Sequence, residues 1–164
     1  QALLKGQSPY AIILCCSDSR VPPEIIFDQG MGEIFVVRVA GNIADPVVLG
    51  SIEYAAEHLG TPLMMVLGHS KCGAVTAAVG AEGEAEGNVG TILETIFPAV
   101  DLAKNELKGK GQEAIIEAAT DHNVNLVCQA LVAQSGIIKH LADAGKLKIV
   151  GAKYDLEDGK VRLF

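Results

Sequence analysis

The chain has 164 residues, of which 49% are hydrophobic and 20% charged, a size and composition typical of one ordinary globular domain. It carries 20 Asp and Glu against 13 Lys and Arg, so its net charge is −7, and a surface of this sign repels phosphate backbones and anionic lipids. We therefore expect neither nucleic acid nor membrane among its partners.

The first half of the sequence alternates between short apolar runs and a helical pattern. Residues 11–16, 34–38 and 63–68 are rich in apolar side chains and are bounded by polar residues, Gly or Pro, which is typical of buried parallel strands. Residues 46–60 predict a helix, with Pro just inside its start and Gly at its end. The second and third strands with this helix form a β-α-β unit, for which a right-handed crossover is expected.

The middle of the sequence is predicted to be a loop followed by long helices. Residues 80–90 are acidic and rich in Gly and predict a surface loop that is not a domain boundary. Helical patterns follow at about 91–108 and 113–144. The second is too long for one helix and is expected to break near Asp121 or Gly136.

The end of the sequence predicts a hairpin. Residues 146–155 and 160–164 have strand character and flank an Asp-Gly pair, a common turn signal. Taken together, the patterns predict a single α/β domain over residues 1–164. It has a mostly parallel four-stranded sheet, an antiparallel edge strand, and helices on the faces of the sheet.

The four cysteines, Cys15, Cys16, Cys72 and Cys128, do not form the pattern of a disulfide framework, which belongs to small secreted domains dense in Cys. Metal binding or burial is the favoured interpretation, and with it a reducing, cytoplasmic compartment. Because the sequence begins at Gln1, a trimmed N-terminal signal remains an alternative.

Residues capable of metal chemistry follow two of the predicted strands. Cys16-Ser17-Asp18-Ser19-Arg20 comes at the end of the first strand, and His69-Ser70-Lys71-Cys72-Gly73 comes after the third. Since ligand sites of open α/β sheets form beyond the carboxyl ends of the strands, we expect the two segments to meet. Cys16, His69 and Cys72 form a Cys2His set with one tetrahedral position open, the stoichiometry of a catalytic zinc site.

Each of these residues also has a simpler explanation. Cys16 alone fits a buried core cysteine, and Asp18 with Arg20 alone fits a surface ion pair of little energetic value. A lone His-x-x-Cys spacing is weak evidence for a metal. From the residues alone, the zinc site and these alternatives both stay open.

The two segments, in this order and spacing, resemble the paired motifs of the β-class carbonic anhydrases. The resemblance runs along most of the chain and is closest to the plant-like branch, whose site is open. It implies the β-carbonic anhydrase fold. Further similar stretches are Gly6-Gln7-Ser8-Pro9, residues 32–38, Ala40-Gly41-Asn42, residues 51–55, and the ending from Val150 to Val161.

The resemblance implies that Cys16, His69 and Cys72 hold one zinc ion per chain. The activity would be reversible hydration of CO2 to bicarbonate and a proton, by hydroxide that zinc generates from its water. Asp18 and Arg20 would be the catalytic dyad, in which the planar guanidinium holds the carboxylate off the metal and aimed at the water.

The resemblance also implies four substrate-binding residues. Gln7 would donate an amide hydrogen bond to a substrate oxygen, and Gly73 would offer its backbone N–H at the start of a helix. Phe35 and Tyr54 match pocket positions, although plain core packing explains both equally well.

The resemblance further implies a homodimer, or a higher oligomer of dimers, because the family's pocket lies at a dimer interface. Only fifteen residues precede Cys16, so the arm that embraces the partner is expected to be short. Two other functions stay open: hydrolysis of COS or CS2 on the same scaffold, and a non-catalytic, zinc-stabilised assembly subunit. The intact pair Asp18 and Arg20 weighs against the second.

Overall fold

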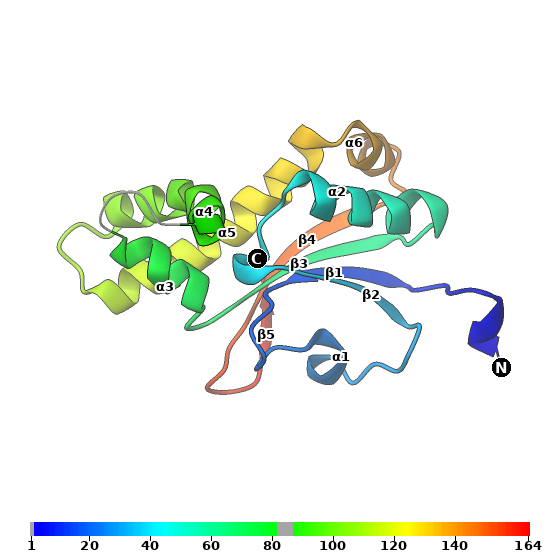
Figure 1. Ribbon diagram of the computed structural model, residues 1–164, viewed down its shortest axis with the longest axis horizontal. Coiled ribbons are helices and arrows are strands. Elements are labelled where there is room, and N and C mark those ends of the chain that lie inside the picture. The colour runs from blue at the N-terminus through cyan, green and yellow to red at the C-terminus, as the bar shows by residue number, and fades with distance from the viewer. Residues whose placement is uncertain (1, 82–86) are drawn as a thin grey trace.

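The structure is a computed structural model that describes residues 2–81 and 87–164. Its centre is a five-stranded sheet in the order β2-β1-β3-β4-β5 (Figure 1). The first four strands are parallel and β5 runs antiparallel to β4, which confirms the predicted sheet. The strands are β1 (Ala11–Cys15), β2 (Ile34–Arg38), β3 (Leu63–His69), β4 (Lys148–Tyr154) and β5 (Val161–Leu163).

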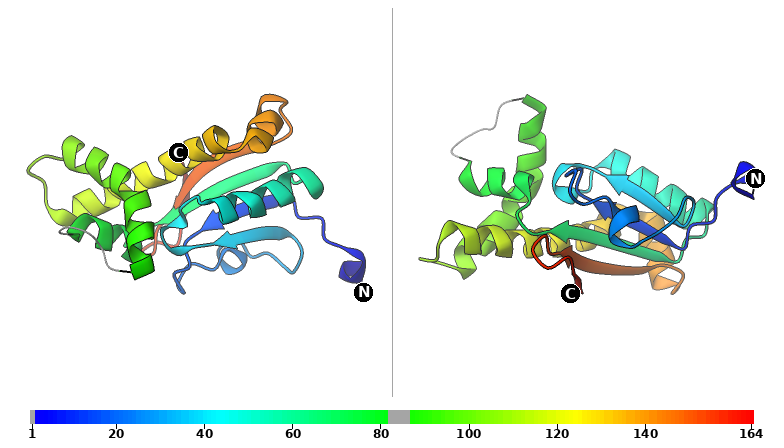
Figure 2. Two further views of the ribbon diagram at one scale, coloured as in Figure 1. Left: turned by 45° about the horizontal axis from the view of Figure 1, so that its top comes forward. Right: turned by 90° about the horizontal axis from the view of Figure 1, so that it is seen from below.

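Helices cover both faces of the sheet and one of its ends. Helices α2, α5 and α6 lie over one face, the short α1 lies under the other, and α3 and α4 extend beyond one end (Figures 1 and 2). No helix within the described ranges is long and apolar enough to cross a membrane. The helices are α1 (Pro23–Ile26), α2 (Pro46–Glu53), α3 (Gly73–Gly80), α4 (Gly87–Glu106), α5 (Gln112–Gln134) and α6 (Gly136–Asp143), with short helical turns η1 (Ala2–Lys5), η2 (Ala40–Asn42) and η3 (Tyr54–His58).

Two helix boundaries follow from side-chain caps. Asp45 accepts a hydrogen bond from the N–H of Val48 at 2.8 Å and so begins α2. Ser135 accepts one from the N–H of Ile138 at 3.1 Å and begins α6. The predicted break in the second long helix is therefore at its Gly136 alternative, and Asp121 lies inside α5.

Two sequence predictions about helices need correction. The predicted loop 80–90 is wrong at its end, because α4 already begins at Gly87; residues 82–86 lie outside the described residues. The buried residues Gly90 and Leu93 pack this first part of α4 on the core, and that packing outweighs the loop-like composition. The predicted helix 46–60 changes at Tyr54 into the wider turn η3.

The pleat of β1 separates its side chains between two apolar clusters. Ile12 and Leu14 pack toward α2 and α5, whereas Ile13 and Cys15 pack on the opposite face with residues of α1 and its end. A third cluster lies at the carboxyl ends of the parallel strands and contains Cys16 together with Cys72. The end of β1 and the end of β3 thus meet under the helices α3 and α4, where the two motif segments lie.

Candidate metal centre

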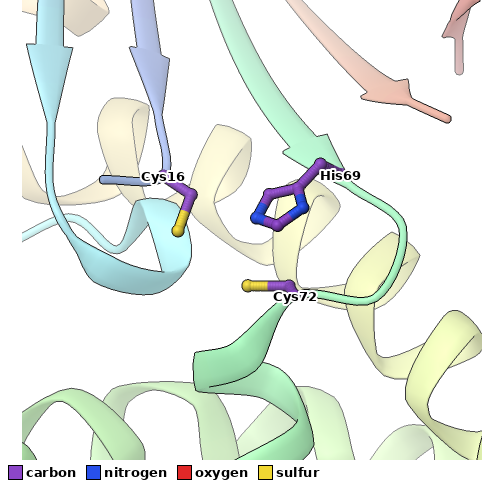
Figure 3. Close-up of side chains that lie close together, drawn as sticks. All are labelled: Cys16, His69 and Cys72. Carbon is purple, nitrogen blue, oxygen red and sulfur yellow. The ribbon is translucent and has the colours of Figure 1, made fainter. Parts of the chain in front are cut away.

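Cys16, His69 and Cys72 come together at the carboxyl ends of two neighbouring strands. Cys16 directly follows β1, His69 is the last residue of β3, and Cys72 is the N-cap of α3. Their side chains point toward one another (Figure 3), and one ligand atom from each lies within 4.8 Å of the others. All three residues are buried. The sequence prediction that these residues converge is confirmed.

The ring of His69 is oriented for coordination through Nε2. Its Nδ1 lies 2.9 Å from the carbonyl oxygen of Ser70, so Nδ1 carries the proton and donates it to that carbonyl. This leaves a lone pair on Nε2, which is buried and has no hydrogen-bond partner among the described residues. A buried ring nitrogen without a partner is costly, and a metal ion would satisfy it.

The two thiols form a pair that already favours one thiolate. Both are free, and the backbone N–H of Gly41 donates to Sγ of Cys16 at 3.3 Å. A hydrogen bond from Cys72, joined by the one from Gly41, lowers the pKa of the Cys16 thiol against the opposing effect of burial. The same bond, together with burial, raises the pKa of Cys72. Two sulfurs and one imidazole nitrogen in this arrangement fit a metal ion that prefers soft ligands.

Asp18 and Arg20 form a bidentate pair beside the three ligand residues. Arg20 donates from Nε to Oδ1 at 2.9 Å and from Nη2 to Oδ2 at 2.7 Å. The side-chain hydrogen bonds from Arg20 hold the pKa of Asp18 well below its usual range. Oδ2 of Asp18 lies 3.9 Å from Nε2 of His69, so an ionised carboxylate stands at the edge of the metal centre.

Known proteins resemble this chain along nearly its whole length. The sequence model of the family described as carbonic anhydrase matches residues 11–161. Carbonic anhydrase 2 of Mycobacterium tuberculosis is 44% identical over 98% of this chain and 77% of its own length. The carbonic anhydrase of Mycolicibacterium smegmatis is 43% identical over 99% and 78%.

Solved structures agree with the sequence relatives. The β-carbonic anhydrase of Coccomyxa in complex with acetazolamide has a TM-score of 0.92 at 26% identity and covers 99% of this chain and 75% of that one. The chain belongs to the β-class carbonic anhydrases. One of two tetrameric β-carbonic anhydrases of Sordaria macrospora has a TM-score of 0.88 at 27% identity, with coverage of 99% and 84%. The family and fold expected from the paired motifs are thus confirmed.

Within a single chain of this β-class carbonic anhydrase, three of the four expected substrate residues lie away from the metal centre. Gly73 begins α3 next to Cys72. Gln7 and Tyr54 instead line a surface hollow together with Leu3 and Leu59, at the amino ends of the parallel strands. The ring of Phe35 lies 6.3 Å from that of Tyr54, so Phe35 also lies near the amino ends of the strands.

One contact of this carbonic anhydrase has no signal in the sequence pattern. Arg38, at the end of β2, donates from Nε to the carbonyl of Cys16 at 3.0 Å and from Nη2 to the carbonyl of Asp18 at 2.6 Å. It therefore fixes the backbone between the first ligand and the dyad. Sequence spacing could not predict this, because both acceptors are backbone carbonyls, which any residue type would supply.

Proposed function

We propose that this chain catalyses the reversible hydration of CO2 to bicarbonate and a proton with one zinc ion held by Cys16, His69 and Cys72. The observation that carries the proposal is the approach of their three ligand atoms to within 4.8 Å, with Nε2 of His69 left unpartnered. When bound by such a set, zinc acidifies a water molecule and supplies the nucleophile that attacks CO2. Cys16, His69 and Cys72 would hold the ion with three protein ligands and leave it open to water.

Asp18 orients the attacking water in this proposal. Its carboxylate remains ionised because Arg20 holds its pKa low, and Oδ2 stands on the side of His69. Oδ1 accepts hydrogen bonds from both the backbone N–H and Nε of Arg20, whereas Oδ2 accepts only from Nη2. Oδ2 therefore keeps a lone pair that can accept a hydrogen bond from the water and fix its direction. Arg20 keeps the carboxylate in the dyad and off the metal, which is the open-site arrangement of the plant-like branch.

Gly73 supplies a donor for the negative charge that develops on the substrate. Its N–H is in the first turn of α3, where backbone N–H groups have no intrahelical acceptor. Gly73 is exposed, and a Cβ built on it would meet no described atom within 4 Å, so there is open space beside this residue. Such a site favours an anion such as bicarbonate.

Gln7, Phe35 and Tyr54 can take part only if a second copy of the chain brings them to the metal centre. The five residues of β1 lie between Gln7 and Cys16, which at about 3.3 Å per residue places them at opposite ends of the strand. We therefore infer a homodimer, or a larger oligomer of dimers, in which these residues line the partner's pocket. The tetrameric Sordaria relative supports an oligomer.

The experiment is a stopped-flow assay of the purified, zinc-loaded protein with CO2, and with COS and CS2 in parallel. We expect rapid CO2 hydration and little or no hydrolysis of the two sulfur compounds. Turnover of COS or CS2 with CO2 hydration at the buffer rate would overturn the proposed substrate. No turnover of any of the three by the fully zinc-loaded protein would leave it a zinc-binding protein without catalysis.

A further inference from the structure

The hydrogen bond to the Cys16 sulfur comes from a turn with an unusual backbone. Gly41 and Asn42 have φ angles of 71° and 45°, both in the left-handed region. This turn, η2, curls beside the sulfur of Cys16 in Figure 3 and directs the N–H of Gly41 at Sγ, 3.3 Å away. Held in this form, the turn places a donor on one ligand atom.

Helices α3 and α4 leave almost no room around the same turn. A Cβ added to Gly41 would lie 2.7 Å from Cδ1 of Ile96 and 3.2 Å from Cβ of Ala74. The turn is therefore confined on two sides by packing. Packing restricts position but does not fix which way a peptide group faces, and a directional contact is needed for that.

Asn123 makes a directional contact with the next peptide group of the turn, which joins Gly41 to Asn42. It lies in the middle of α5, is only 2% exposed, and donates from Nδ2 to the carbonyl oxygen of Gly41 at 2.8 Å. The helix can come so close because β3 has Gly68 beneath it: a Cβ there would lie 2.6 Å from Cγ2 of Val124. A buried Asn inside a helix is unfavourable unless its amide is paired, so this contact accounts for a buried Asn in the middle of α5.

We propose that Asn123 is a positioning residue that acts through Gly41 on the sulfur of Cys16. By fixing the turn, it keeps the Gly41 N–H on Sγ, and that hydrogen bond draws electron density from the sulfur and limits what the sulfur donates to the metal. Partners of this kind orient metal ligands and tune the metal. The proposal rests on the proposed function only in taking Cys16 as a metal ligand.

The test replaces Asn123 by Leu, which is close to Asn in size and has no hydrogen-bond donor for the Gly41 carbonyl. The matched control is Val127→Ala, one helical turn further along α5, where a buried side chain is shortened without touching the turn. Two quantities are measured on the full chain. One is zinc affinity by competition with a chelator, and the other is the thiolate-to-metal charge-transfer band of the protein loaded with Co(II).

We expect Asn123→Leu to bind zinc about 10–100-fold more weakly, because the turn no longer holds the Cys16 sulfur in place. The charge-transfer band should move to longer wavelength, because the sulfur loses a hydrogen bond and donates more electron density to the metal. Val127→Ala should leave the band where it is. If Asn123→Leu does not fold, Asn123→Ser, whose hydroxyl is too short to reach Gly41, is judged by the same two readouts. A band at the wild-type wavelength with zinc affinity equal to that of Val127→Ala would overturn the proposal. A wild-type Co(II) protein without any thiolate band would overturn both this proposal and the assignment of Cys16 as a ligand.

Discussion

Arg20 donates to both carboxylate oxygens of Asp18, at 2.9 Å from Nε and at 2.7 Å from Nη2, while Oδ2 of the same carboxylate lies 3.9 Å from Nε2 of His69. The dyad is thus complete beside the metal centre and separate from it. The proposed function assigns two different roles to these residues, holding the metal and directing the reaction, and the two groups should respond differently to substitution.

Asp18→Asn and Arg20→Ala should keep zinc and lose turnover. Asp18→Asn removes the charged acceptor, and Arg20→Ala removes the hydrogen bonds that orient it. Positioning of this kind typically contributes about 10²–10⁴-fold in rate. CO2 hydration and zinc content are measured on the same samples. Arg162→Ala is the control, since it breaks an ion pair with Asp155 at 2.9 Å that has no part in the centre. CO2 hydration within a few-fold of wild type in either dyad variant would show that the dyad is not catalytic.

Cys72→Ala should lose zinc and activity together, with a large loss of stability, because metal binding is coupled to folding. Cys15→Ala is a close control: Cys15 is as buried as Cys72 and adjoins Cys16, but it packs on the opposite face of the sheet. It should retain one zinc per chain. The zinc content of both variants is measured by elemental analysis. One zinc per chain in Cys72→Ala would show that Cys72 is not a ligand.

The convergence of Cys16, His69 and Cys72 could be predicted because it depends on simple rules. Parallel neighbouring strands end at the same edge, and both ligand segments follow such strands directly. The alternation of side chains along a strand likewise accounts for Cys15, which lies on the other face of the sheet. These features are local in the sequence, so they remain visible without any knowledge of packing.

Other features depended on contacts between distant segments. The start of α4 at Gly87 is decided by burial of Leu93, and the turn at Gly41 is fixed by an Asn 82 residues further along. Side-chain chemistry was therefore predicted better than the contacts that position it.

Two glycine substitutions should change stability in opposite directions. Gly68→Ala would place a Cβ 2.6 Å from Val124 and should destabilise the fold by about 1–3 kcal/mol through overpacking. Gly50→Ala, inside α2, meets no described atom within 4 Å and should stabilise it by about 0.5–1 kcal/mol through helix propensity. Urea unfolding of the zinc-loaded proteins measures both. Equal stability of the two variants would show that α5 does not pack on β3 as closely as described.

The reactivity of Cys128 should rise steeply with pH. Burial raises the pKa of this thiol to about 11, so its thiolate fraction grows about tenfold per pH unit below that value. Alkylation by iodoacetamide, followed by peptide mapping, should therefore be about 100-fold faster at pH 10 than at pH 8. Cys15, whose pKa burial raises to about 12, should stay unmodified in the folded protein.

The raised pKa of Cys128 also affects the stability of the fold at alkaline pH. The pKa of Cys128 is about 11 in the folded protein and about 8.5 in the unfolded chain. The contribution of this thiol to the stability of the fold is therefore complete below about pH 8.5 and is lost as the pH rises toward 11. Cys128→Ala should therefore show a smaller loss of unfolding free energy between pH 8 and 10 than wild type. An alkylation rate that does not change with pH would contradict the raised pKa and this expectation with it.

The most direct test of the proposed function is a titration of the metal-free protein with zinc while CO2 hydration is followed by stopped flow. The activity should be at the buffer rate without zinc, rise in proportion to added zinc, and reach its plateau at one zinc per chain. Full activity before any zinc is added, or a chain that binds one zinc and still hydrates CO2 no faster than buffer, would contradict a zinc-dependent carbonic anhydrase at Cys16, His69 and Cys72.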